Sequence, residues 1–183
     1  MYATIQTASG RYVDLSAPSP RHIEIGDIAH ALSNICRFGG HTREFYSVAQ
    51  HSVMASRIVP PEHALAALLH DAAEAYVGDM VLPAKQMLPE FRTLEADVWQ
   101  AVAVAFGLPE ELPACVKRAD LVMLATERRD LMAEQSTPWP VLEGVTTLPD
   151  AITPWKPSDA RALFVLRYWE IKDRMLAAER SAA

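Results

Sequence analysis

Four ionisable side chains occur at positions of the chain where an apolar residue would be expected. His51 and Asp120 each occupy the apolar stripe of a separate amphipathic segment, and the adjacent pair His70 and Asp71 lies in a third, almost wholly apolar one. Burying a lone carboxylate costs several kcal/mol unless it is paired or bound to a metal. A shared cation would satisfy all four groups, so the sequence predicts a metal site.

Two imidazoles and two carboxylates favour one divalent transition metal as the cofactor, with Mn, Co, Zn, Fe and Ni all suitable. Adjacent residues on a helix diverge by about 100°, so His70 and Asp71 can straddle one ion lying against their helix. His51 and Asp120 would close the site from neighbouring helices. Four protein ligands of this kind leave positions open for water and substrate, which points to catalysis more than to structure.

Two further acidic residues follow the histidine–aspartate pair at short spacing. Glu74 comes four residues after His70, on the same helical face, where it could accept a proton from the attacking water. Asp79 follows Gly78 on a predicted loop and could bind a sugar or protonate a leaving oxygen. Each also has an ordinary structural interpretation, Glu74 as a solvated helix residue and Asp79 as a turn former. The chemical interpretation therefore depends on the arrangement of all these residues.

The surrounding pattern predicts a single all-α domain with a small N-terminal β-hairpin. The chain has 183 residues, half of them apolar, and can bury roughly 70% of its unfolded surface in one core. Its predicted parts are an N-terminal hairpin within 1–20, metal-site helices within 27–135, a loop over 137–157 and a C-terminal helix over 158–180. The helices are predicted over 27–38, 47–59, 62–77, 91–106, from about 113 to 132, and 158–178. Asp27 and Ser47 are predicted to cap the first two, and Pro60–Pro61 and Gly107 to end the second and fourth. The inward side chains of the last helix are predicted to be Phe164, Tyr168, Ile171 and Met175. The segments LPAK and MLPE between them are predicted to be loops.

Composition argues against several classes of function. The net charge is −6 with mixed signs along the chain, which gives no reason to expect a nucleic-acid polymer as ligand. Apolar stretches are too short to cross a bilayer and the N-terminus does not resemble a signal peptide, so we expect a cytoplasmic protein without membrane contact. Cys36 and Cys115 form no C-x-x-C pair, which argues against a redox motif or a cysteine-rich zinc site.

Three stretches, FYSVAQHS, LLHDAAEAYVGDMVLPAK and VKRADLVMLATE, resemble the HD superfamily of metal-dependent phosphohydrolases. The resemblance runs from about residue 27 to residue 131. It is greatest to the bacterial 5'-deoxynucleotidase group and the related phage deoxyadenosine triphosphate triphosphohydrolases. It implies an HD-domain bundle of about six helices.

The resemblance also assigns roles. It makes Glu74 a catalytic residue beside the attacking water and places Asp79 at a catalytic or sugar-contacting position. Arg37 matches a substrate-binding arginine and Lys85 a lysine that can reach phosphate, although each could instead form a surface salt bridge. The metal ligands it implies are His51, His70, Asp71 and Asp120.

The chain departs from the nucleotidases at Phe38, where a tryptophan is expected after the arginine. Phe38, the N-terminal hairpin and the tryptophan-bearing loop over 137–157 would help to shape a base pocket. His41 is a further candidate, which could contact phosphate, orient Arg37 or lie idle on the surface.

The leading functional hypothesis is hydrolysis of a nucleoside 5'-monophosphate, with a deoxyribonucleotide preferred, to nucleoside and phosphate. One alternative is a triphosphohydrolase that removes intact triphosphate from a deoxynucleoside triphosphate such as dATP. A second is a metal- or nucleotide-binding module without turnover, and the third is a purely structural bundle. The expected partner is a small nucleotide, and related nucleotidases are oligomeric, so a homo-oligomer is expected.

Overall fold

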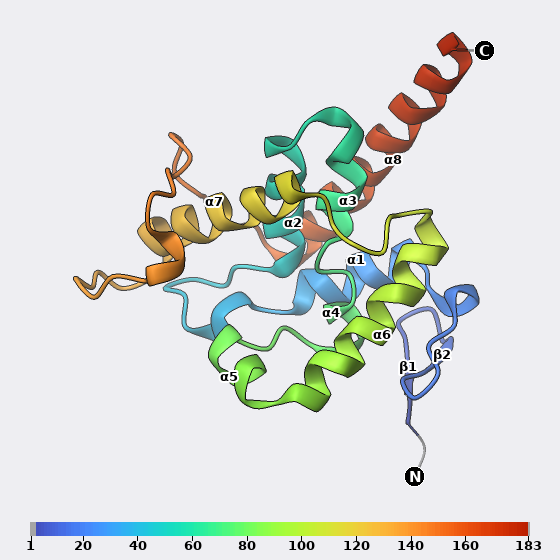
Figure 1. Ribbon diagram of the computed structural model, residues 1–183, viewed down its shortest axis with the longest axis horizontal. Coiled ribbons are helices and arrows are strands. Elements are labelled where there is room, and N and C mark those ends of the chain that lie inside the picture. The colour runs from blue at the N-terminus through green and yellow to red at the C-terminus, as the bar shows by residue number, and fades with distance from the viewer. Residues whose placement is uncertain (1–2, 183) are drawn as a thin grey trace.

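The computed structural model describes residues 3–182 and consists mainly of helices, with a small antiparallel hairpin near the N-terminus (Figure 1). The elements are β1 (Thr4–Gln6), β2 (Tyr12–Asp14), α1 (Ile25–Asn34), α2 (Val48–Ile58), α3 (Ala64–Leu69), α4 (Glu74–Val77), α5 (Leu82–Met87), α6 (Pro89–Phe106), α7 (Ala114–Leu131) and α8 (Pro157–Ala182), together with short 3-10 helices. The mainly helical fold and the hairpin are both as predicted. No helix within residues 3–182 combines the length and apolar character needed to span a membrane.

The hairpin is attached to α1 through Asp27. We predicted that Asp27 would cap a helix over 27–38, but α1 begins at Ile25 and ends at Asn34. The Asp27 carboxylate is buried and accepts hydrogen bonds from Thr7 Oγ1 at 2.8 Å and from the backbone N–H and hydroxyl of Ser9 at 2.7 Å each. Its short polar side chain therefore anchors the hairpin instead of capping the helix.

The helix α2 is the central element of the fold and packs against α1, α3, α7 and α8 (Figure 1). The Ser47 side chain accepts a hydrogen bond from the N–H of Gln50, which caps α2 as predicted. The helix ends at Ile58, shortly before the Pro60–Pro61 pair that was expected to stop it.

The helix predicted over 62–77 is interrupted in the structure. It is divided into a 3-10 turn over Pro61–His63, then α3, a turn over residues 70–73, and α4. Backbone hydrogen bonds from Ala72 to Leu69, Glu74 to Asp71 and Tyr76 to Ala73 run over three residues, so the chain is wound more tightly here than in an α-helix. The break coincides with the histidine–aspartate pair.

Two other predictions require correction. The LPAK segment is helical, because α5 begins with Pro83 in its first turn, where the absent N–H of proline costs nothing. Met175 was predicted to face inward with Phe164, Tyr168 and Ile171, but it is 39% exposed while the other three are buried. The C-terminal part of α8 extends away from the other helices (Figure 1).

Candidate metal centre

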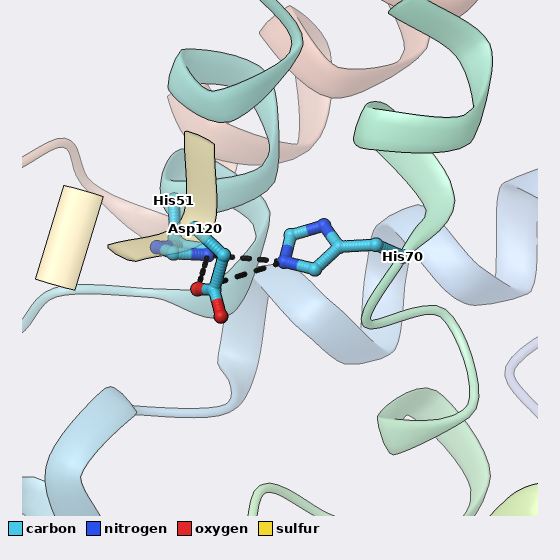
Figure 2. Close-up of side chains that lie close together, drawn as sticks. All are labelled: His51, His70 and Asp120. Atoms are coloured by element: carbon cyan, nitrogen blue, oxygen red, sulfur yellow. Dashed lines mark hydrogen bonds and ion pairs between the residues drawn. The ribbon is translucent and has the colours of Figure 1, made fainter. Parts of the chain in front are cut away.

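Three elements bring the predicted metal ligands together. His51 lies on α2 with no exposed surface, Asp120 lies on α7, and the adjacent His70 and Asp71 occupy the turn between α3 and α4. Figure 2 shows both imidazoles and the Asp120 carboxylate converging on one point. The side chain of Asp120 is 41% exposed, so the cluster reaches the surface on that side.

The donor atoms have the spacing of a first coordination shell. His51 Nε2 lies 3.2 Å from His70 Nε2, 3.2 Å from Asp120 Oδ1 and 3.6 Å from Asp71 Oδ2. His70 Nε2 lies 3.3 Å from Asp71 Oδ2 and 3.9 Å from Asp120 Oδ1. Ligands held at about 2.1 Å from a metal lie roughly 3.0 to 3.4 Å from one another in octahedral or tetrahedral sites. The cluster of His51, His70 and Asp120 could hold a metal ion.

The hydrogen bonds on the far side of each imidazole support this fit. Nδ1 of His51 lies 2.6 Å from Oε1 of Glu127, and Nδ1 of His70 lies 2.8 Å from the carbonyl oxygen of Ala67. Both partners can only accept, so each Nδ1 carries a proton, and it is Nε2 of each imidazole that faces the cluster. Two Nε2 atoms 3.2 Å apart repel each other through their lone pairs unless a proton or a metal ion lies between them, so the two imidazoles have the donor chemistry of a metal site.

Neighbouring carboxylates raise the pKa of the two histidines, although burial alone would lower it. Burial and the Arg37 charge lower the pKa of His51, but Glu127 and Asp120 raise it to about 10. Burial would raise the pKa of Asp120, yet hydrogen bonds from His51 and His70 hold it well below its usual range. The cluster therefore favours positive charge at its centre, from a proton or from a metal ion.

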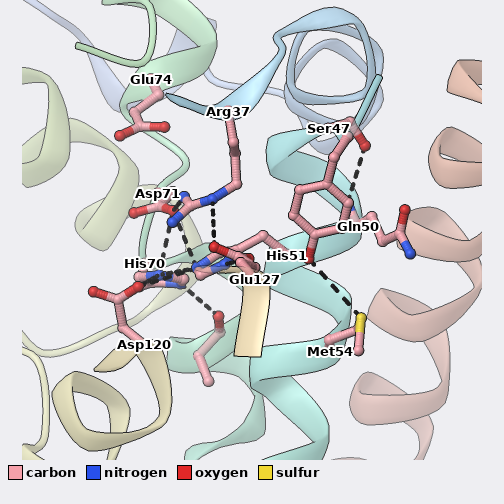
Figure 3. A network of polar contacts seen from close by, with 12 residues as sticks. Arg37, Ser47, Gln50, His51, Met54, His70, Asp71, Glu74, Asp120 and Glu127 are labelled. Atoms are coloured by element: carbon pink, nitrogen blue, oxygen red, sulfur yellow. Dashed lines mark hydrogen bonds and ion pairs between the residues drawn. The ribbon is translucent and has the colours of Figure 1, made fainter. Parts of the chain in front are cut away.

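Arg37 lies directly beside the predicted ligands. Its position follows from an antiparallel bridge between Cys36 and Ser47 and from a hydrogen bond donated by its own N–H to the carbonyl of Tyr46. The guanidinium donates from Nη1 to Asp71 Oδ2 at 3.3 Å and from Nε to Glu127 Oε2 at 3.2 Å (Figure 3). Nη2 of Arg37 makes no hydrogen bond to any of the described residues, so this nitrogen can bind a ligand.

Glu74 also faces this region and is buried. Its Oε2 has no hydrogen-bond partner among the described residues, whereas its Oε1 accepts a hydrogen bond from Lys85 at 3.3 Å. Burial and the charges of Asp71 and Asp79 raise the pKa of Glu74 well above its usual range. A buried carboxyl with one free oxygen and a raised pKa is suited to hold and transfer a proton.

Lys85 and Asp79 lie close to Glu74. Lys85 also donates a hydrogen bond to Glu95 at 2.6 Å, so its ammonium bridges two carboxylates instead of standing free. Burial raises the pKa of Asp79, while the nearby charge of Arg37 lowers it and that of Asp71 raises it. Both residues thus lie within electrostatic range of the cluster.

Phe38 and Trp139 come together from distant parts of the chain. Their ring centroids are 6.3 Å apart, and the Arg37 guanidinium carbon lies 5.5 Å from the Phe38 ring centroid. Phe38 has a positive φ of 56°, a conformation that bulky side chains rarely adopt and that is often retained at functional sites. His41 is exposed, and no hydrogen bond or ion pair within the described part of the chain links its side chain to the cluster.

A cavity of about 610 Å³ opens beside His70, Asp71 and Glu74. Its remaining walls come from α5, α6 and the segment before and at the start of α7. Basic and acidic side chains both line it, with an indole ring among them: Lys85, Arg92, Glu95, Trp99, Glu110, Glu111 and Lys117. Its volume is sufficient for a ligand of nucleotide size.

Sequence reasoning missed Glu127, which is fully buried between His51 and Arg37. It lies seven residues, or about two turns, after Asp120 on the same helix, so the two carboxylates share a face of α7. That spacing was the available signal. Nothing in the sequence alone, however, indicated that Glu127 would meet an arginine 90 positions earlier.

The fold and its candidate site define a mainly helical protein with a histidine- and aspartate-rich centre that could hold a metal ion. No model of a known protein family matches the chain. It is 44% identical over 170 residues to a protein of Escherichia coli (strain K12) named Uncharacterized protein YfdR, covering 92% of this chain and 96% of that protein. A 42% identity over 121 residues links it to an uncharacterized protein of Rhodobacter capsulatus, covering 61% of this chain and 62% of the relative. The chain belongs to the family of YfdR.

Proposed function

We propose that the chain is a metal-dependent phosphohydrolase of the HD type, acting on nucleoside 5'-monophosphates and releasing phosphate. The observation that carries this proposal is the convergence of His51, His70, Asp71 and Asp120 beside the buried carboxyl of Glu74. A purely structural site would not require a buried acid with one unpartnered oxygen next to its ligands. The resemblance of the three sequence stretches to HD phosphohydrolases supports the same assignment.

The four ligands would hold one divalent transition metal. When bound, such an ion would supply an electrophile for the phosphoryl group and make water a better nucleophile near neutral pH. The fit of the site to a metal ion rests on the spacing of the donor atoms and on the orientation of the two imidazoles.

The remaining residues have separable roles. Glu74 would hold and transfer the proton of the attacking water through its free Oε2. Arg37 would bind a phosphate oxygen through Nη2, since Nε and Nη1 are already held by carboxylates. Asp79 would contact the sugar or the leaving oxygen, and Lys85 would hold Glu74 in place.

Phosphate release from a panel of nucleoside monophosphates tests the proposal. Protein loaded with Mn²⁺ or Co²⁺ is expected to release orthophosphate, and Asp71→Ala is expected to release none above background. Asp27→Asn is the matched control, because it neutralises a buried aspartate whose partners are Thr7 and Ser9. Equal inactivity of wild type and Asp71→Ala on every nucleotide would contradict the proposal.

A triphosphohydrolase is the second candidate, and the basic residues of the cavity favour it. Arg92 and Lys117 line the same cavity, where they could neutralise a longer phosphate chain. Product identity separates the two candidates: tripolyphosphate from a deoxynucleoside triphosphate indicates the second, and orthophosphate from a monophosphate indicates the first. Nucleotide-dependent thermal stabilisation without any product would instead indicate a binding module.

A further inference from the structure

Glu127 connects the candidate metal site to the candidate substrate site. Its two carboxylate oxygens have different partners: Oε1 accepts from Nδ1 of His51 at 2.6 Å and Oε2 accepts from Nε of Arg37 at 3.2 Å (Figure 3). The side chain has no exposed surface. A buried carboxylate is retained at this position only because both of its oxygens are paired with strong donors.

The contact with His51 determines which ring nitrogen faces the cluster. A carboxylate cannot donate, so the hydrogen lies on Nδ1 and the lone pair of Nε2 is directed at Asp120 and His70. His70 receives the same orientation from the backbone carbonyl of Ala67. Glu127 is thus the side chain that fixes the tautomer of His51, and second partners of this kind commonly tune metal affinity.

The contact with Arg37 fixes the plane of the guanidinium. Nε is held by Glu127 and Nη1 by Asp71, and a planar group held at two of its nitrogens retains little rotational freedom. Nη2 is then presented in a set direction beside Asp71. A phosphate oxygen bound there would lie next to the metal ligands.

Building on the proposed function, we infer that Glu127 is a positioning residue that aligns His51 for the metal and Arg37 for the phosphoryl group through one carboxylate. It does not contact the substrate. Its loss should weaken metal binding through His51 and raise KM through Arg37, and a merely structural acid would produce neither effect.

Glu127→Gln is the sharpest test because it preserves the shape of the side chain. The amide has one accepting oxygen, so it can satisfy either His51 or Arg37 but presents an N–H₂ group to the other. If Glu127 serves only to fill space, this variant behaves as wild type. If Glu127 is a positioning residue, Co²⁺ binding weakens about 10- to 100-fold, the visible absorption of bound Co²⁺ changes, or KM rises by a similar factor.

Affinity for Co²⁺ is measured by competition with a chromogenic chelator, and KM by phosphate release from the best nucleotide of the panel. Asp27→Asn is the control for loss of a buried acid, and its Co²⁺ affinity should match wild type. Should Glu127→Gln fail to fold, Glu127→Asp carries the test, because it keeps the charge but withdraws the carboxylate by one methylene. The same losses are expected of it.

The outcomes separate this inference from the proposed function. Absence of Co²⁺ binding by wild type would overturn the metal site itself. Tight Co²⁺ binding by wild type, together with unchanged affinity, spectrum and KM in the folded Glu127 variant, would overturn the positioning role and leave the metal site standing. A loss of affinity in Asp27→Asn equal to that in Glu127→Gln would also overturn it.

Discussion

Addition of a divalent metal to chelator-treated protein is expected to raise its melting temperature substantially. The donor atoms of His51, His70 and Asp120 lie 3.2 to 3.9 Å apart, close to their spacing around an ion, so little binding energy is lost to rearrangement. At a free ion concentration 1,000 times Kd, ligand binding stabilises the folded state by about 4 kcal/mol. For a chain of this length each kcal/mol shifts the melting temperature by roughly 2–4 °C, which gives about 8–16 °C.

Asp120→Asn supplies the control for this prediction. Its side chain is 41% exposed, so an amide of the same shape should leave the fold intact while removing a charged ligand. If the variant binds 100-fold more weakly, about 1.4 kcal/mol of stabilisation remains at the same ion concentration, or roughly 3–6 °C. Thermal melts with and without Mn²⁺ measure both shifts. No shift in wild type, or equal shifts in the two proteins, would refute the assignment of the ligands.

Three further predictions concern catalysis, packing and acid stability. Glu74→Gln should lower kcat by about 10²- to 10⁴-fold with unchanged bound metal, and phosphate release by protein of measured metal content tests this. Phe164→Ala empties a fully buried site and should cost about 3–5 kcal/mol of unfolding free energy; a urea midpoint equal to that of wild type would be inconsistent with the core. Burial tends to raise the pKa of Asp27, but hydrogen bonds from Ser9 and Thr7 lower it. The stability it contributes is therefore present above its unfolded pKa of about 3.9 and is lost as pH falls through the lower folded value, so wild type and Asp27→Asn should differ in urea midpoint at pH 7 and converge in strong acid.

Local signals in the sequence were sufficient to predict much of the fold. Ser47 caps α2 through its hydroxyl, and Gly107 ends α6 with a left-handed backbone, because each effect depends on residues within one turn. Asp27 was misassigned for the opposite reason. Its carboxylate could cap a helix or bind a hairpin 18 residues earlier, and only the folded chain determines which donors reach it.

The candidate site shows the same division between local and distant contacts. The spacing of Glu74 from His70 is a local property and could be read from the sequence. The pairing of Arg37 with Glu127 joins two segments that meet only after α7 has packed against α2. The contact between Phe38 and Trp139 likewise depends on the path of the long loop over residues 132–156.

The break in the helix at His70 shows how an adjacent histidine–aspartate pair can serve one ion. On a regular α-helix the two side chains would diverge by about 100°, and both would point away from the helix. The turn over residues 70–73 is wound more tightly than an α-helix, which does not narrow that angle, so it is the conformations of the two side chains that bring Nε2 of His70 within 3.3 Å of Oδ2 of Asp71. The same turn starts α4 at Glu74, which brings its carboxyl to the cavity wall beside both residues. Five consecutive positions of the chain therefore bring two donors and one acid to the wall of the same cavity.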